Sequence, residues 1–379
     1  MFFTRAATSI LKTNLGIKRG EKVLIFTDKP GKTTVTSPPK DDLFQREKIK
    51  EFCLILRDLA GSLTKEAIFY EYAETGMHGI EPPEGLWKRA FGERVVSELK
   101  RNRLLARLLK KKIKPEELRL VEKIIKAYAK RPVNVVIALS KYSTSHTNFR
   151  DLLTRVCRAR YASMPLFEIS MLEGPMNVDW KALKKRTELI ASALNRAETI
   201  TITTPNGTEI SFSVKGRKVF KDTGILTRPG AFGNLPAGEV FLAPLEGTAN
   251  GTLILEWAPT RPLSYPLKLY VRDGYVKDIE GDDPFKEDLL RKLRENPLNA
   301  NIAELGIGTN EGARRPDNIL ESEKILGTIH IALGDNSSFG GRVRTPFHQD
   351  FVFFRPTVKV KRGNKEETII SDGKLKSHL

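Results

Sequence analysis

The hydrophobic pattern of the first half of the chain alternates between strand-like and helical segments. Short apolar runs, which are typical of buried strands, are followed by longer stretches whose apolar residues recur every three to four positions. The predicted strands are 22–26, 67–72 and 133–140, and the predicted helices are 41–63, 93–111, 115–130 and 148–161. Strand followed by helix, repeated, indicates an α/β domain with a parallel sheet.

The pattern changes after a predicted helix over 180–195. Alternating segments flank Asn206-Gly207, and an Asn-Gly turn favours a hairpin because it tolerates positive φ angles. Short strands are predicted at 198–203, 208–214, 239–243, 251–257, 267–271, 328–333, 351–360 and 367–370, with a helix at 284–295. We therefore expect an N-terminal α/β domain over 1–195 and a C-terminal α+β domain over 196–379 that is mainly antiparallel sheet.

Composition narrows the class of protein. A chain of 379 residues that is 40% hydrophobic can bury a large core in two or three domains. No apolar run approaches the roughly 20 residues of a membrane helix, and Arg5 interrupts what would be the apolar stretch of a signal peptide. With only Cys53 and Cys157, the sequence offers neither a disulfide framework nor a cysteine-based zinc site. We expect a cytoplasmic protein that does not associate with membranes.

The net charge of +18 lies almost entirely in the first 200 residues and is densest between 100 and 160. A basic stripe on a helix can bind nucleic acid. Here, however, leucines at helical spacing leave the Lys and Arg residues on the outer face, and no helix-turn-helix, zinc finger or aromatic ladder accompanies them. We expect a solvated surface without a specific nucleic-acid site. Submicromolar binding to nucleic acid at about 0.15 M salt would contradict this expectation.

Three of the five histidines lie in the second half, and two of them have surroundings that suit a metal. His330 lies between Ile329 and Ile331 on a predicted strand, so its side chain points to the face opposite those isoleucines. His348 and Asp350 are two positions apart and therefore share one strand face. An imidazole and a carboxylate on one face can bind a common ion.

Two glutamates in apolar surroundings add to this pattern. Glu239 lies at the start of a predicted strand, and Glu304 lies between Ile302 and Leu305. A buried carboxylate is costly unless a cation or a metal accompanies it. Each glutamate alone could be a structural ion-pair partner. Together with the histidines in the same sheet-rich half, they favour a metal site.

Other chemistries lack their sequence signatures. The glycines of 306–312 resemble a dinucleotide-binding loop, but the third glycine comes one residue late and no strand–loop–helix unit surrounds them. The sequence contains neither a Gly-x-Ser-x-Gly elbow nor a phosphate-binding loop. Nicotinamide-dependent, serine-hydrolase and nucleotidase functions are therefore not expected.

Several ordered segments resemble the thermophilic aminopeptidase family, which includes aminopeptidase T and aminopeptidase S. They are NLGIKRGEKVLIF, TSHTNFR with ASMP, LPAGEVFLAP, ANGTL, ELGIGTN, GTIHIALGD and HQD, and they span nearly the whole chain. The resemblance implies a metallopeptidase, usually dimeric, with an N-terminal α/β domain and a C-terminal domain that carries a two-metal site. By this resemblance, the metal ligands are Glu239, Glu304, His330, His348 and Asp350.

The chain departs from aminopeptidases of the T type at two site positions. It has Ser337 where they carry a tyrosine and Ile325 where they carry a glutamate; Glu323 and Asp335 are candidate substitutes for that glutamate. Two histidines and one carboxylate also form the open set that suits Fe(II) and oxygen, and ring-cleaving dihydroxypyridine dioxygenases resemble this family. An Fe(II) dioxygenase and a catalytically decayed metal-binding protein therefore stand beside the peptidase as alternatives.

The peptidase hypothesis predicts metal-assisted hydrolysis of the N-terminal peptide bond. Glu304 would bridge two divalent ions, zinc, cobalt or manganese, and would be the catalytic residue, while a metal-activated water attacks the carbonyl. Arg342 or Arg344 would stabilise the developing charge, unless both are ordinary surface residues. The expected partners are peptides with a free N-terminus and a second copy of the chain.

Overall fold

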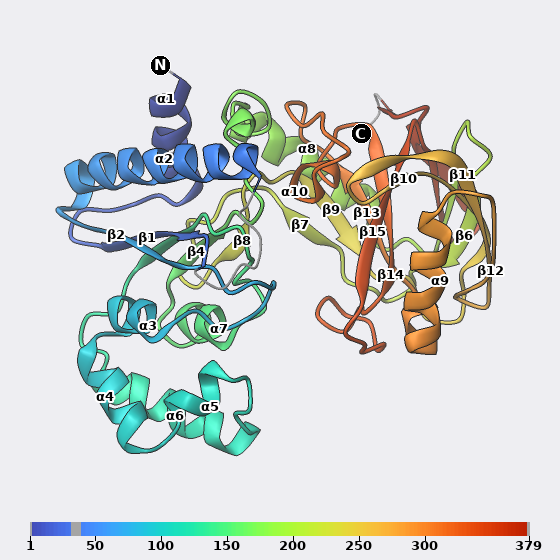
Figure 1. The fold of residues 1–379 in the computed structure, drawn as a ribbon. Coiled ribbons are helices and arrows are strands. Elements are labelled where there is room, and N and C mark those ends of the chain that lie inside the picture. The colour runs from blue at the N-terminus through green and yellow to red at the C-terminus, as the bar shows by residue number, and fades with distance from the viewer. Residues whose placement is uncertain (1, 32–38, 377–379) are drawn as a thin grey trace. The chain divides into compact units, whose positions relative to one another are not determined.

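The computed structural model describes residues 2–31 and 39–376, so His378 lies outside the described residues. The chain forms two compact units (Figure 1). The N-terminal unit comprises Met1–Asn177 and Gly224–Pro236, and the C-terminal unit comprises Val178–Thr223 and Ala237–Leu379.

The N-terminal unit is built on a five-stranded sheet in which every pair of neighbouring strands is parallel. Its strand order is β2-β1-β3-β4-β8. The strands are β1 (Lys22–Lys29), β2 (Glu66–Ala73), β3 (Val135–Ala138), β4 (Arg160–Ser163) and β8 (Phe232–Asn234). Strands β3 and β4 are buried throughout, as expected of a parallel sheet that is covered on both faces. The predicted α/β domain with a parallel sheet is confirmed.

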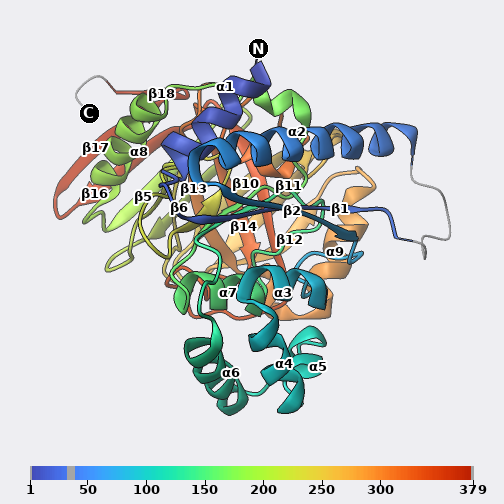
Figure 2. The ribbon, with the colours of Figure 1, turned by 90° about the vertical axis from the view of Figure 1, so that its left-hand side faces the viewer.

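Helices cover both faces of this sheet (Figures 1 and 2). The helices α1 (Phe2–Thr8) and α2 (Lys40–Thr64) lie on one face, whereas α3 (Glu84–Phe91) and α7 (Asn148–Arg155) lie on the other. Beyond α3 follow α4 (Glu93–Arg101), α5 (Leu105–Leu109) and α6 (Pro115–Tyr128). The unit also contains a π-helix at Ser9–Asn14 and a 3-10 helix at Ile169–Leu172.

Two predicted helices end earlier than the periodic pattern indicates. The helix expected over 148–161 stops at Arg155, and its last residues belong to strand β4. Arg158 adopts a φ of 61°, a left-handed conformation that no helix continues through. The helix expected over 93–111 is divided into α4 and α5 by Arg103, whose φ is 57°. Apolar spacing continues across both breaks, so the pattern alone does not reveal them.

The C-terminal unit contains two antiparallel sheets. The first has the order β12-β11-β10-β6-β5-β16-β17-β18. Its strands are β5 (Thr199–Thr203), β6 (Glu209–Ser213), β10 (Asn250–Ala258), β11 (Arg261–Arg272), β12 (Tyr275–Glu280), β16 (Thr357–Arg362), β17 (Lys365–Ser371) and β18 (Lys374–Leu375). The second has the order β15-β14-β13-β9-β7, with β7 (Phe220–Asp222), β9 (Glu239–Leu242), β13 (Ile302–Gly308), β14 (Thr328–Gly334) and β15 (His348–Phe354). The expected antiparallel, sheet-rich domain is confirmed.

One hydrophobic core joins these two sheets. Ile200, Ile202 and Leu253 of the first sheet belong to the same buried cluster as Ile329 and Phe351 of the second. Helix α8 (Trp180–Leu194) contributes to this core, and the unit also holds α9 (Phe285–Glu295), a 3-10 helix at Pro297–Ala300 and the short α10 (Ile319–Ser322). Because side chains alternate along a strand, the neighbouring positions on the second sheet face away from this core.

The chain departs from the predicted division in two places. Helix α8 belongs to the C-terminal unit, although residues 1–195 were expected to form one domain, and residues 224–236 return to the N-terminal unit, where β8 pairs with β4. The strand predicted over 351–360 is two strands in different sheets, since Arg355 has a φ of 51° and Pro356 offers no N–H. Within the described part of the chain, no helix combines the length and the apolar character needed to cross a membrane.

Candidate metal centre

Four neighbouring strands of the second sheet bring the five predicted site residues together. Glu239 lies on β9, Glu304 on β13, His330 on β14, and His348 and Asp350 on β15. The register places Glu304 opposite Ala332, which is in turn opposite Asp350. These side chains alternate with core residues such as Leu305, Ile331 and Phe351. All five therefore lie on the face of the sheet that is turned away from the core.

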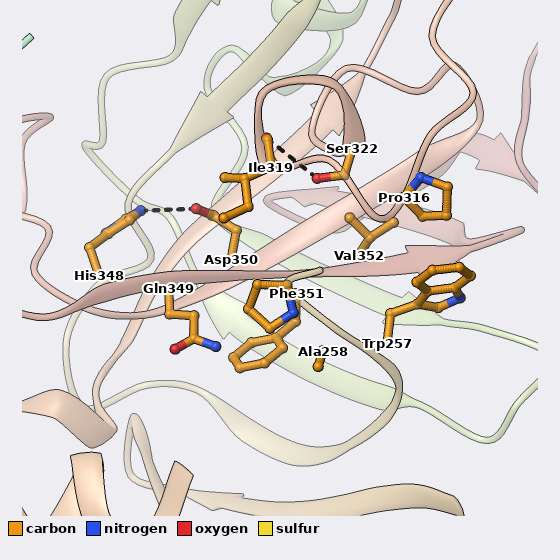
Figure 3. Close-up of a pocket in the computed structure, with 11 residues that line it drawn as sticks. Trp257, Ala258, Pro316, Ile319, Ser322, His348, Gln349, Asp350, Phe351 and Val352 are labelled. Carbon is orange, nitrogen blue, oxygen red and sulfur yellow. Dashed lines mark hydrogen bonds and ion pairs between the residues drawn. The ribbon is translucent and has the colours of Figure 1, made fainter. Parts of the chain in front are cut away.

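Both histidines face the carboxylate of Glu304, one at each oxygen. His330 Nε2 lies 3.6 Å from Glu304 Oε1 and 3.5 Å from Glu239 Oε2. His348 Nε2 lies 3.4 Å from Glu304 Oε2 and 3.5 Å from Asp350 Oδ2 (Figure 3). These separations exceed the usual 2.9–3.0 Å of an N–H···O hydrogen bond. Glu304, His348 and Asp350 have ligand atoms within 4.8 Å of one another, so they could hold one metal ion.

Two glycines on β13 make room for this arrangement. A Cβ atom on Gly306 would lie 1.9 Å from the Cε1 and Nε2 atoms of His330, so the imidazole lies directly against the backbone. A Cβ atom on Gly308 would lie 2.0 Å from the carbonyl oxygen of Ile325, so the segment before β14 crosses close to this strand. Neither glycine has a positive φ. Space therefore accounts for both glycines.

The orientation of His348 is fixed by a main-chain contact. Its Nδ1 lies 2.7 Å from the carbonyl oxygen of Asp335, which can only accept a hydrogen bond. Nδ1 therefore carries the proton in the neutral ring, and the lone pair of Nε2 points toward Glu304 and Asp350. The ring of Phe339 packs edge-on against the imidazole at 5.9 Å. A backbone carbonyl on Nδ1 is a common support for metal-binding histidine.

The carboxylate of Asp335 supports this loop and does not join the site. It accepts hydrogen bonds from the backbone N–H groups of Ser337 and Thr345, both at 3.0 Å, and from the Ser337 hydroxyl. Of the two candidate substitutes for the missing glutamate, Asp335 therefore has a positioning role. Arg342 and Arg344 are both exposed.

Asp335→Ala is expected to weaken metal binding without unfolding the protein. The substitution removes the carboxylate that accepts hydrogen bonds from the N–H groups of Ser337 and Thr345, and these bonds hold the loop whose main-chain carbonyl orients His348. Loss of such outer contacts typically lowers metal affinity by about 10–100-fold. Metal titration monitored by calorimetry measures the change. Asp288→Ala, which removes an exposed carboxylate paired with Arg291, is the control and should bind metal as the unmodified protein does.

The second candidate substitute, Glu323, belongs to a charged cluster that also contains the five predicted site residues and Lys324. Lys324 Nζ is fully buried and lies 3.0 Å from Glu239 Oε1 and 2.5 Å from Glu323 Oε2. The Glu323 side chain is 17% exposed and interacts electrostatically with Asp350 and His330. Lys324 was not among the residues expected in the site. It follows the polar residues Glu321–Glu323 in the sequence, so the local pattern gave no signal that its side chain is buried.

The carboxylates dominate the electrostatics of the centre. Burial by itself would lower the pKa of His330, but Glu304, Asp350 and Glu239 outweigh burial and raise that pKa to about 9. For His348, burial likewise opposes a rise of the pKa to about 10, which is caused first by Asp350. Burial raises the pKa of Glu304.

The cluster also leaves polar atoms without partners. Among the described residues, His330 Nδ1 and Asp350 Oδ1 are buried and make no hydrogen bond. Four carboxylates face one lysine and two histidines, so the centre carries an excess of negative charge when the imidazoles are neutral. A buried excess of negative charge requires protons or a metal cation. The donor set, imidazole nitrogen and carboxylate oxygen, suits a divalent transition metal.

A cavity of about 250 Å³ adjoins His348 and Asp350 along the edge strand β15 (Figure 3). Its other walls come from the end of β10 with the residue that follows it and from the segment around α10, and they are largely apolar: Trp257, Pro259, Pro316 and Ile319. The cavity can hold a small organic molecule beside the two candidate ligands.

Comparison with known proteins gives one family and a shared fold. The family model described as 2,5-dihydroxypyridine 5,6-dioxygenase matches residues 122–377, which is more than half of the chain. A curated relative, 2,5-dihydroxypyridine 5,6-dioxygenase of Pseudomonas putida, is 24% identical over 187 residues, which are 44% of this chain and 52% of the relative. The chain thus matches about half the length of that relative.

Two solved structures have a similar fold over almost their whole length. The 2,5-dihydroxypyridine dioxygenase of Pseudomonas putida KT2440 has a TM-score of 0.66 at 16% identity, with 99% of this chain and 97% of that chain covered. AmpT of Thermus thermophilus, an aminopeptidase T, has a TM-score of 0.57 at 14% identity, with coverage of 99% and 98%. At these identities the likeness shows the fold alone. It confirms the fold class that the aminopeptidase resemblance implied.

Proposed function

The chain belongs to the 2,5-dihydroxypyridine 5,6-dioxygenase family, and on this premise we propose that it is a metal-dependent dioxygenase that opens a hydroxylated aromatic ring. The observation that carries the proposal is the convergence of two imidazoles on Glu304, with Asp350 beside them. Two histidines and a carboxylate form the facial ligand set of many Fe(II) oxygenases, which leaves positions open for substrate and oxygen.

The residues present fit a divalent ion. Glu304, His330, His348 and Asp350 are the residues that would hold it. When bound, iron in such a site supplies the electronic route by which oxygen and an aromatic ring react. The chain itself orients His348: the Asp335 carbonyl holds Nδ1, so the lone pair of Nε2 points toward Glu304 and Asp350. It also keeps this face of the sheet largely buried.

The adjoining cavity fits a planar ring. Trp257, Pro259 and Pro316 offer flat apolar surfaces, and the cavity reaches His348 and Asp350. A ring held there would place its hydroxyl groups toward the charged cluster, where a carboxylate such as Glu323 can accept a proton. Apolar walls with a few polar groups at one end are typical of small-molecule sites.

A metallo-aminopeptidase is the second candidate function. It is favoured by the position of Glu304, whose two oxygens face different histidines, as a carboxylate that bridges two ions would. The fold shared with AmpT is consistent with it. This candidate function implies two ions of zinc, cobalt or manganese, peptide substrates and a homodimer. The third candidate is a protein that binds metal but has no catalytic activity.

Metal analysis and two activity assays distinguish these functions. The protein is purified without added metal, its metal content is measured, and it is then loaded separately with Fe²⁺ under anaerobic conditions or with Zn²⁺, Co²⁺ or Mn²⁺. The proposal expects oxygen uptake by the Fe²⁺ form with 2,5-dihydroxypyridine or a related dihydroxylated ring. Release of amino acids from unblocked dipeptides would instead establish the aminopeptidase. Metal binding without either activity would favour the decayed protein.

A further inference from the structure

Strand β15 lies at the end of its sheet and pairs with a single neighbour, β14. Its other edge is therefore not paired with a strand. Five consecutive residues of β15, 348–352, line the cavity beside the metal centre, so the cavity lies along this edge and not on one face of the strand. An unpaired edge presents main-chain N–H and C=O groups that can bind a further strand or a ligand.

Hydrogen bonds at the start of β15 show which residues direct their main chain to the cavity. The N–H of Gly334 donates to the carbonyl oxygen of Asn301 at 2.8 Å, and its carbonyl oxygen accepts from the Asn301 side chain at 2.9 Å, so both groups point away from β15. The pair of Gly334 and His348 is thus not hydrogen-bonded. Because the two kinds of pair alternate in an antiparallel ladder, the main chains of His348, Asp350 and Val352 point to the unpaired edge.

Val352 is the most buried of these three residues. Only 8% of its surface is exposed, whereas Asp350 and His348 are more exposed. Among the described residues, no loop or side-chain group is hydrogen-bonded to the main-chain N–H or C=O of Val352. Main-chain groups in buried surroundings are almost always paired, because an unpaired group costs about as much free energy as a lost hydrogen bond. A molecule in the cavity would supply both partners.

The walls on the two sides of this edge favour a flat molecule. Figure 3 shows Pro316 and Ile319 on the side of Val352, and Trp257 on the side of Phe351. A planar ring that pairs with the edge lies in the plane of the sheet, so these apolar walls enclose it. A peptide strand would instead direct its side chains alternately toward both walls. At about 250 Å³ the cavity is also smaller than the roughly 300–1,000 Å³ typical of ligand sites.

We propose that the main chain of Val352 selects the ring that this site accepts, by binding a ring in which an N–H group stands next to a carbonyl. A residue whose main chain faces outward on an antiparallel edge offers one donor and one acceptor on the same side. This pair is complementary to such a lactam edge. A 2-hydroxypyridine has a lactam edge in its pyridone form, whereas a diphenol such as hydroquinone has no ring nitrogen. The inference rests on the ring-opening function proposed above and specifies what distinguishes its substrate from other dihydroxylated rings.

Binding of two small lactams tests this recognition without catalysis. The protein is titrated with 2-pyridone and with N-methyl-2-pyridone in the presence of Zn²⁺, which has no redox chemistry. We expect 2-pyridone to bind about 10-fold or more tightly, because the methyl group removes one hydrogen bond and obstructs the other. In protein labelled with ¹⁵N-valine, the amide resonance of Val352 is identified by its absence from Val352→Ala. It should shift with 2-pyridone only.

A proline substitution tests the same contact in turnover. Val352→Pro removes the N–H that faces the cavity, and proline is tolerated on an edge strand where its nitrogen faces away from the ladder. With the Fe²⁺-loaded protein, kcat/KM for 2,5-dihydroxypyridine should exceed that for hydroquinone, and Val352→Pro should reduce this ratio by about 10-fold or more. Val352→Ala is the matched control: it keeps both main-chain groups, so the ratio should persist even if the rates change.

The outcomes separate this inference from the function on which it rests. Equal binding of the two lactams, or similar kcat/KM values for 2,5-dihydroxypyridine and hydroquinone, would overturn the role of Val352 and leave the ring-opening function standing. Selective binding of 2-pyridone without oxygen uptake would support the recognition and remove the function. Displacement of 2-pyridone by a lower concentration of trialanine would overturn the inference, because the edge would then bind a peptide strand. If Val352→Pro does not fold, the amide shift of Val352 decides.

Discussion

Replacement of His348 by alanine is expected to remove the bound metal ion and the catalytic activity together. His348 Nε2 faces Glu304 and Asp350, and it is the one nitrogen donor of the group that these three residues form, so alanine removes that donor. Loss of an outer contact costs about 10–100-fold in metal affinity, so we expect loss of a ligand to cost more than about 100-fold. Metal content after dialysis and activity of the metal-loaded protein measure both effects.

The fold should survive this substitution. His348 is partly exposed at the end of an edge strand, and the core of the unit is built from other residues, such as Phe351 and Ile331. His78→Ala and His146→Ala are the controls, because both histidines are exposed residues of the N-terminal unit. They should change neither metal content nor activity. Retention of full metal content and activity by His348→Ala would refute the assignment of the centre.

Gly306→Ala is expected to disrupt the centre and to destabilise the C-terminal unit. The added methyl group would lie 1.9 Å from the ring of His330, which is only 1% exposed, so the ring or the backbone would have to shift within a buried site. Overpacking of a buried site typically costs about 1–3 kcal/mol of unfolding free energy. Displacement of His330 should also lower metal affinity by about 10-fold or more. Denaturant unfolding and metal titration report the two effects separately.

Gly61→Ala provides the matched comparison. Gly61 lies within helix α2, and a Cβ atom there would have no atom within 4 Å. Alanine is the better helix former, so this change should stabilise the protein by about 0.5–1 kcal/mol. If Gly306→Ala left stability and metal affinity unchanged, His330 would not be held against the β13 backbone as described.

The spacing of hydrophobic residues along the chain was sufficient to predict much of the architecture. Alternation of strands and helices predicted the parallel sheet of the N-terminal unit, because a parallel pair needs a long connection that is usually helical. Period-two alternation placed His348 and Asp350 on one face, since successive side chains on a strand point to opposite faces. These features depend on residues that are near in sequence.

The sequence did not reveal where several helices and strands end. The ends of the helices at Arg155 and Arg101, and the division between β15 and β16, follow from single residues in left-handed conformations. Arginine does not signal such a conformation as glycine or asparagine would. Strand β13 was not predicted as a strand because Ala303, Glu304 and two glycines interrupt its apolar pattern.

By itself, the sequence determined the fold class and the five residues that meet on one sheet face, the latter with the help of the aminopeptidase resemblance. Only the tertiary structure decided how they meet: that Glu304 lies between two imidazoles, that the Asp335 main chain orients His348, and that Lys324 is buried against Glu239. The physical reason is that these contacts join strands and loops far apart in the chain. Their charge balance depends on distances of a few ångströms, which no local pattern of residues encodes.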